Sequence, residues 1–302
     1  MTALKRWFVS EDGTAKVGRV AAKTLRVRLD AVWSELRQAC EPCESREHVH
    51  QLRVATRRTL AALKAFRAVL PSKQRLWFEK RLRRLRRAAG EARDLDVLTI
   101  RLTQTGESRA RRQLVAMLSK QRTKSRNPIR EQHEQLLDAD WQGRVNRLLE
   151  RLHGRRSQSD FETFARRRFK PMIRSFFEKA DRKLRDADEI HELRIEGKKL
   201  RYALEIFATV FPPRIRAHCQ ESLEQLQKTL GDFTDHASAA DRFARWAHSA
   251  DAGSHRELLI ELCRDENTLA DVSRRMFSTW WNPSRRRSLR RRFERTLRRH
   301  SA

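Results

Sequence analysis

The chain has 302 residues, of which 68 are Lys or Arg and 39 are Asp or Glu, so its formal net charge is +29. It contains only 9 Gly and 7 Pro, and residues that lose little on entering a helix dominate, so we predict an all-α protein. Positive charge in this excess repels itself unless an anionic partner is near, and arginine, its main carrier, matches phosphate oxygens in pairs. The composition therefore indicates a polyanionic partner and favours phosphate over carboxylate groups as its anions.

No run of 18 apolar residues occurs, so the sequence predicts neither a signal peptide nor a membrane span, and we expect a cytoplasmic protein. Cys40 and Cys43 form one C-x-x-C pair, whereas Cys219 and Cys263 stand alone. A structural zinc site usually needs a second close pair of ligands. We therefore expect free thiols, no metal site and no cofactor.

Helical spacing of apolar residues predicts three helices at the start of the chain. The second runs from about residue 46 to 70 and stops at Pro71. The third runs from about residue 73 to 89, is crowded with arginine, and is expected to end at Gly90 as a C-terminal cap. The first runs from about residue 14 to 40, and the side opposite its apolar residues is basic, carrying Lys16, Arg19, Lys23 and Arg26.

A fourth helix is expected from about residue 91, helical patterning continues to about residue 152, and the polar stretch 153–160 is the expected boundary between two halves. The second half then begins with a helix from Phe161 to about Leu184. A helix from about residue 189 to 211, stopped by Pro212, and another ending at Gly231 follow. We expect the C-terminal residues 283–300 to form a basic amphipathic helix. The first helix of this half again has a basic back, formed by Arg167, Lys170 and Arg174.

The two halves match one another when the chain is shifted by 141 positions. This shift places His50-Gln-Leu-Arg53 on His191-Glu-Leu-Arg194 and keeps register without a gap to Asp94 and Asp235. Two helical repeats are therefore predicted, at about residues 12–153 and 160–300. Further matched pairs are Arg57 and Arg58 with Lys198 and Lys199, Leu63 with Leu204, Phe66 with Phe207, Pro71 with Pro212, Leu85 with Leu226, and Gly90 with Gly231.

The matched segments carry a cationic stripe along one helix face. At about 100° per residue, His50, Arg53, Arg57 and Lys64 fall within a sector of about 60°, opposite an apolar face. Stacked cations one turn apart repel by a few tenths of a kcal/mol per pair, a cost that a bound anion would reverse. In the second repeat the same sector holds His191, Arg194 and Lys198, with Arg201 at its edge.

Two questions stay open at this point. A basic helix face can be merely solvated, although two copies in register favour a binding surface. Each histidine can act as an anion donor, as a pH-tuned structural group, or in phosphoryl chemistry. The surrounding cations disfavour a bound metal, and no acid–base partner for catalysis is evident, so we favour anion binding and expect no enzymatic activity.

The strings HVHQLRVATRRTLAALKAF and EIHELRIEGKKLRYALEIF, separated by GEARDLDVL, resemble the two halves of the CHAD family, the conserved histidine α-helical domain. The resemblance covers roughly residues 12–300. It implies two helical bundles related by a pseudo-twofold axis around a basic central cavity, and inorganic polyphosphate as the ligand, with collection on polyphosphate granules. It carries over to His50, Arg53, Arg57, Arg58, His191, Arg194, Lys198, Lys199 and Arg201, to which we add Lys64 and the basic backs of the helices at 14–40 and 161–184 as further polyphosphate-binding residues.

Nucleic acid is the main alternative partner, bound through the basic surface and the C-terminal helix, because a backbone-only binder also needs many Arg and Lys. The chain has one Tyr, and most Phe fall in apolar stripes that a bundle would bury, which disfavours stacking of bases on exposed aromatic residues. A phosphohistidine or polyphosphate-hydrolysing enzyme is a less favoured third hypothesis.

Overall fold

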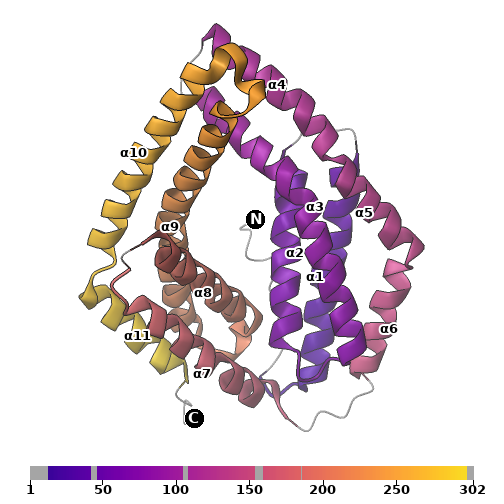
Figure 1. Ribbon diagram of the computed structural model, residues 1–302. Coiled ribbons are helices and arrows are strands. Elements are labelled where there is room, and N and C mark those ends of the chain that lie inside the picture. The colour runs from indigo at the N-terminus through magenta and orange to yellow at the C-terminus, as the bar shows by residue number, and fades with distance from the viewer. Residues whose placement is uncertain (1–12, 42–45, 105–107, 154–158, 185, 298–302) are drawn as a thin grey trace. The chain divides into compact units, whose positions relative to one another are not determined.

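The computed structural model describes residues 13–41, 46–104, 108–153, 159–184 and 186–297. Within these ranges the chain is helical, with an isolated bridge between Lys16 and Asp160 and no strand, so the predicted all-α fold class is confirmed. The chain divides into two compact units, residues 1–164 and 165–302. Each unit has its own helices and its own core (Figure 1).

Unit 1 contains α1 (Val17–Cys40), α2 (Glu47–Ala65), α3 (Ser72–Gln104), α4 (Arg109–Ser125), α5 (Asn127–Asp138) and α6 (Trp141–His153). α1 packs against α2, α5 and α6, while α3 packs against α2, α4 and α5. The apolar face of α2 is buried at Leu52 and Leu63. Phe66, just after α2, stacks on Phe161 and Phe164, and this explains why the start of α7 (Phe161–Ala180) belongs with unit 1.

Unit 2 contains the rest of α7 together with α8 (Ala187–Ile206), η2 (Ala208–Val210), α9 (Pro213–Ala247), η3 (Ala250–His255), α10 (Arg256–Trp280) and α11 (Pro283–Leu297). α9 and α10 run side by side along most of their length, and α8 and α11 pack on α9 (Figure 1). The core between α7, α11 and the segment after η2 is aromatic. It contains Phe169, Phe177, Phe211 and Phe293, with ring centroids about 5–6 Å apart.

Helix ends recur at the spacing of 141 residues. α2 ends at Ala65 and α8 at Ile206, and α3 begins at Ser72 and α9 at Pro213. A proline, Pro71 or Pro212, precedes each second helix, and the residue before a proline is pushed out of helical geometry. Burial follows the same register, since 1% or less of each side chain is exposed in the pairs Leu63 with Leu204, Phe66 with Phe207, Leu82 with Leu223 and Leu85 with Leu226.

The prediction that Gly90 and Gly231 end helices is wrong. α3 continues through Gly90 to Gln104, so no fourth helix begins near residue 91, and α9 continues through Gly231 to Ala247. A capping glycine needs a positive φ, and in the described chain the glycine with positive φ is Gly253. Good helix formers on both sides of Gly90 carry α3 past it. The residues after Gly231 are weaker helix formers, and α9 there is part of a helix that packs against α8 and α10. Smaller deviations lie at three helix ends, since α2 ends at Ala65 and not at 70, α7 at Ala180 and not at 184, and α8 at Ile206 and not at 211. A 3₁₀ turn, η2, leads from α8 to Pro212.

Candidate anion-binding site

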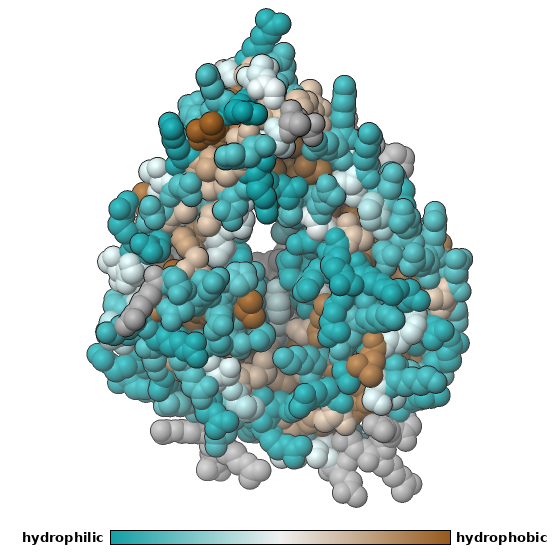
Figure 2. Space-filling model, viewed as in Figure 1, coloured by the Kyte–Doolittle hydropathy of each residue, from teal (hydrophilic) through white to brown (hydrophobic). Residues whose placement is uncertain are grey.

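The cationic stripe of unit 1 lies on the half-buried side of α2, beside α3. Leu52 and Leu63 point into the core, and His50, Arg53 and Arg57 are half-buried on another side. Lys64, at the end of the helix, is exposed. Figure 2 shows hydrophilic side chains over the adjoining helix α3. The amphipathic pattern of α2 therefore presents three predicted residues together, as the sequence indicated.

Arg53 is held against α3. Its Nη1 donates a hydrogen bond to the main-chain oxygen of Arg86 at 3.1 Å. A β-carbon placed on Gly90 would lie 3.6 Å from the same nitrogen, so the guanidinium packs against α3 at Gly90. Asp94 is close enough to favour the charged form of Arg53. The glycine that looked like a helix cap is therefore a contact surface for an arginine.

Positive charges crowd this part of α2 and α3. Burial, followed by the charge of Arg57, lowers the pKa of Arg53, and Asp94 opposes that shift. Burial, followed by the charge of Arg93, lowers the pKa of His50. The charges that act on both groups come from α2 and α3, and most of them are cations. A bound anion would relieve this repulsion, which is the physical basis for an anion site here.

The same arrangement occurs in unit 2. The Nη2 atom of Arg194 would lie 3.6 Å from a β-carbon on Gly231, and it is 3.3 Å from Oδ1 of Asp235. Each of these three residues is the counterpart, 141 positions on, of Arg53, Gly90 and Asp94. His191 is exposed and Lys198 half-buried on the same helix. The matched stripes therefore share the placement of an arginine beside a glycine of the next long helix.

Three predicted residues are placed differently from the rest of the stripe. Arg58 is only 8% exposed, and its main-chain oxygen accepts a hydrogen bond from Nη1 of Arg28 on α1 at 2.8 Å. Arg58 thus lies toward α1, because it is about 100° further round α2 than Arg57. Lys199, its counterpart, pairs with Glu196 at 2.5 Å. Arg201 pairs with Glu205 at 3.6 Å and packs over the ring of Tyr202.

The basic backs of α1 and α7 are exposed surfaces of their own. Arg26 donates to Oδ1 of Asn146 on α6 at 2.8 Å, so this edge of α1 lies beside α6, and not beside α3. Arg174 lies 3.8 Å from Glu178 one turn along α7. The remaining predicted residues of these two surfaces are exposed, namely Lys16, Arg19, Lys23, Arg167 and Lys170.

Sequence reasoning did not assign Arg86 and Arg93 to the site. Both belong to the arginine-rich helix α3, and the hydrogen bond between Arg53 and the main-chain oxygen of Arg86 joins two different helices. A signal was nevertheless present, because both arginines lie on the face of α3 that also carries Gly90.

The described residues include no group of three or more His, Cys, Asp or Glu placed to hold a metal ion. Cys40, Cys219 and Cys263 are free thiols, whereas Cys43 lies outside the described residues. Burial raises the pKa of Cys219 to about 12 and that of Cys40 to about 11. Both are therefore neutral thiols at pH 7 and poor ligands or nucleophiles in that state.

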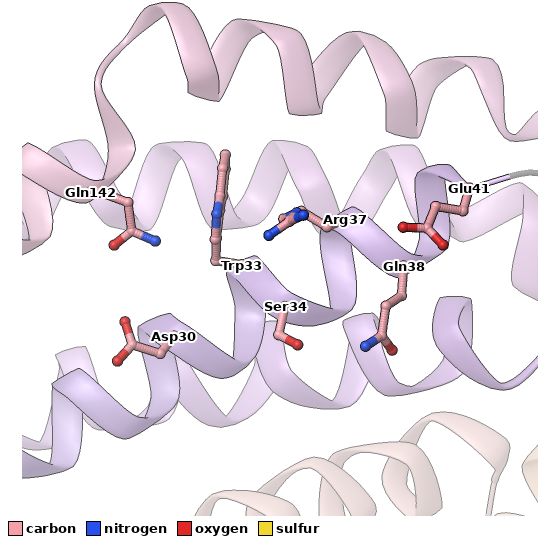
Figure 3. Close-up of a pocket in the computed structure, with 7 residues that line it drawn as sticks. All are labelled: Asp30, Trp33, Ser34, Arg37, Gln38, Glu41 and Gln142. Atoms are coloured by element: carbon pink, nitrogen blue, oxygen red, sulfur yellow. The ribbon is translucent and has the colours of Figure 1, made fainter.

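A separate pocket of about 330 Å³ lies between α1 and α6 of unit 1 (Figure 3). Trp33 and Arg37 stand in its middle, with Gln142 of α6 at one end. Asp30 and Glu41 also line it, so its charges are mixed and it does not suit a polyanion. Across the described part of the chain, every helix is too short or too polar to cross a membrane.

Comparisons with known proteins agree on one fold. The sequence profile of the CHAD domain family matches residues 23–244. The crystal structure of the CHAD domain from the plant Ricinus communis superposes with a TM-score of 0.71 at 21% identity, over 95% of this chain and 94% of that one. PptA from Streptomyces chartreusis superposes with a TM-score of 0.56 at 19% identity, over 88% of this chain and 99% of that one. A comparison with curated proteins finds no matching sequence.

Proposed function

We propose that this chain, which belongs to the CHAD domain family, binds inorganic polyphosphate on the cationic faces of α2 and α8. The observation that carries the proposal is one arrangement that recurs in both units: an arginine packs beside a glycine of the next long helix, with its guanidinium nitrogen 3.6 Å from where a β-carbon on that glycine would lie. Arginine forks of this kind bind phosphate oxygens in pairs. A chain of phosphates supplies such oxygens at every residue.

Crowding of cations supports a ligand that is both highly charged and compact. His50 and Arg53 are half-buried next to Arg57, Arg86 and Arg93, and their pKa values are lowered as a result. This state is costly in the free protein, and an anion with several charges along a short length would offset several repulsions at once. Inorganic polyphosphate has that charge density.

Nucleic acid is less well suited to these surfaces. Base stacking on a single strand needs exposed aromatic faces, whereas Trp281 is 4% exposed and the guanidinium of Arg285 covers the ring of Trp280 at 4.6 Å. The C-terminal helix α11, Pro283–Leu297, packs into the core of unit 2 through Leu289 and Phe293, which are at most 2% exposed. Deleting it would expose this core, so its role in binding is better tested by charge changes alone.

A competition titration separates polyphosphate from nucleic acid. Fluorescent polyphosphate is bound to the protein, and unlabelled polyphosphate or duplex DNA is added at equal phosphate concentration. We expect polyphosphate to displace the label and DNA to do so only at large excess. A matched α11 charge variant, Arg287→Ala/Arg291→Ala/Arg295→Ala, changes three exposed residues and should leave polyphosphate binding intact. Equal competition by DNA, together with loss of binding in the α11 charge variant, would reject the proposal.

We also propose that the site binds and does not hydrolyse or accept phosphoryl groups, and that the protein resides in the cytoplasm, collected on polyphosphate granules. The crowded cations around His50 support binding, since they disfavour the bound divalent cation that phosphoryl transfer commonly uses. Incubation with labelled polyphosphate, with and without Mg²⁺, should yield neither phosphohistidine nor shortened chains. Either product would overturn the non-catalytic assignment.

A further inference from the structure

The two matched surfaces differ sharply in charge although they share helix ends and buried positions. Residues 47–104, which hold α2 and α3, contain 15 Lys or Arg and 5 Asp or Glu. The matched residues 188–245, on α8 and α9, contain 9 Lys or Arg and 10 Asp or Glu. The same fold is built with either balance, so the excess of cations in unit 1 is not a requirement of the fold.

Part of this difference lies on α3, on the face that carries Gly90. At about 100° per residue, Arg86 and Arg93 fall with Gly90 in a sector of about 60°. Their counterparts on α9 are Gln227 and Thr234. Arg86 is exposed and Arg93 half-buried, so α3 offers two cations beside the stripe at positions where α9 offers an amide and a hydroxyl.

In unit 2 the amide serves packing. The main-chain oxygen of Arg194 accepts a hydrogen bond from Nε2 of Gln227 at 3.1 Å. In unit 1 the matched oxygen, of Arg53, accepts instead from Oγ1 of Thr56 at 3.0 Å. Gly197 stands where Thr56 would be, and a β-carbon there would lie 2.6 Å from Nε2 of Gln227. Two matched positions therefore differ together between the units. In unit 2, Gln227 fills the space beside Gly197, whereas in unit 1 its counterpart Arg86 is exposed.

Unit 2 also neutralises its own cations with glutamates on α8. Three such residues pair with neighbouring Lys or Arg, which lowers the positive potential that the surface presents to a polyanion. At the matched positions α2 has two uncharged residues and one lysine. The pairs are Lys179 with Glu192 (2.5 Å), Lys199 with Glu196 (2.5 Å) and Arg201 with Glu205 (3.6 Å), and the matched residues of α2 are Gln51, Ala55 and Lys64.

We propose that the two surfaces have diverged, so that unit 1 is the main polyphosphate-binding half and unit 2 is a charge-compensated counterpart of lower affinity. In unit 1 the site extends from α2 onto α3, where Arg86 and Arg93 are further binding residues. This inference rests on the proposed function and adds which half carries it and through which side chains.

The sharpest test converts unit 1 to the residues of unit 2. Arg86→Gln/Arg93→Thr should lower the affinity for inorganic polyphosphate about tenfold per arginine, because a charged hydrogen bond is typically lost with each. The slope of log affinity against log salt should fall by about 0.7 per arginine. Arg84→Gln/Arg87→Gln removes the same charge from another face of α3 and controls for net charge, and thermal unfolding of each variant confirms that it folds.

A second pair of variants compares the two units directly. Arg53→Ala/Arg57→Ala should lower polyphosphate affinity at least tenfold more than the matched Arg194→Ala/Lys198→Ala. Equal losses in a protein that binds polyphosphate would overturn the asymmetry and leave the proposed function standing. A loss in Arg86→Gln/Arg93→Thr no larger than that in the α3 control would remove the two arginines from the site. Failure of the unaltered chain to bind polyphosphate would overturn the proposed function itself.

Discussion

Replacing Gly90 by alanine tests why a glycine lies in the middle of a long helix. Glycine inside a helix is about 1 kcal/mol less favourable than alanine. The added β-carbon would lie 3.6 Å from Nη1 of Arg53, an ordinary van der Waals contact. Apart from its chain neighbours and the nearby backbone of α3, no other heavy atom of the described residues lies within 4 Å. Gly90→Ala should therefore stabilise unit 1 by about 1 kcal/mol without moving the guanidinium. For a unit of this size, that corresponds to a rise in Tm of about 2–4 °C.

Thermal unfolding followed by circular dichroism measures the first effect, and a polyphosphate titration measures the second. Gly231→Ala is the matched variant, since its β-carbon would lie 3.6 Å from Nη2 of Arg194, and we expect the same rise. A lower Tm in either variant would contradict the packing argument. Weaker polyphosphate binding by Gly90→Ala at unchanged stability would show that Arg53 requires the bare glycine surface.

Two further predictions concern titration and buried charge. Burial, followed by the charge of Arg93, lowers the pKa of His50, so folding disfavours its charged form. The free energy of unfolding therefore decreases as pH falls below about 6.5, the pKa of histidine in the unfolded chain. A bound polyanion favours the charged form of His50, so polyphosphate affinity should rise as pH falls below 7, and His50→Gln should flatten that rise. An identical dependence of affinity on pH in the variant would contradict a role for His50 in binding. Arg122 Nε pairs with Oδ1 of Asp96 at 2.6 Å, and the Asp96 side chain is 1% exposed. Arg122→Leu should lower the free energy of unfolding, measured in urea at pH 7, by about 3 kcal/mol. Burial raises the pKa of Asp96 against the opposing charge of Arg122, so Asp96 takes up a proton at lower pH and the loss at pH 4 should be smaller. Equal losses of stability at both pH values would refute this.

Much of the fold could be predicted because its signals are local. Pro71 and Pro212 marked the breaks before α3 and α9, and the helical spacing of apolar residues identified the buried face of α2 at Leu52 and Leu63. The stripe of His50, Arg53 and Arg57 followed from the same spacing. These features depend on one helix at a time, which is the information that periodicity contains.

The features that were missed depend on contacts between helices. Gly90 was expected to be a helix cap, and only the course of α3 shows that it lies inside a helix, beside Arg53. Arg58 is charged and next to the stripe, yet the packing of α1 buries it. Arg86 joins the site because α3 packs across α2. Spacing along one helix carries no information on which neighbour will cover a given face.

The central claim, that polyphosphate binds to the cationic faces of α2 and α8, is tested most directly by isothermal titration of a variant that removes both stripes. This variant is His50→Ala/Arg53→Ala/His191→Ala/Arg194→Ala. We expect it to keep its helical circular dichroism and to lose polyphosphate binding, while the α11 charge variant binds as the unaltered chain does. Unchanged affinity in the folded stripe variant would contradict the claim.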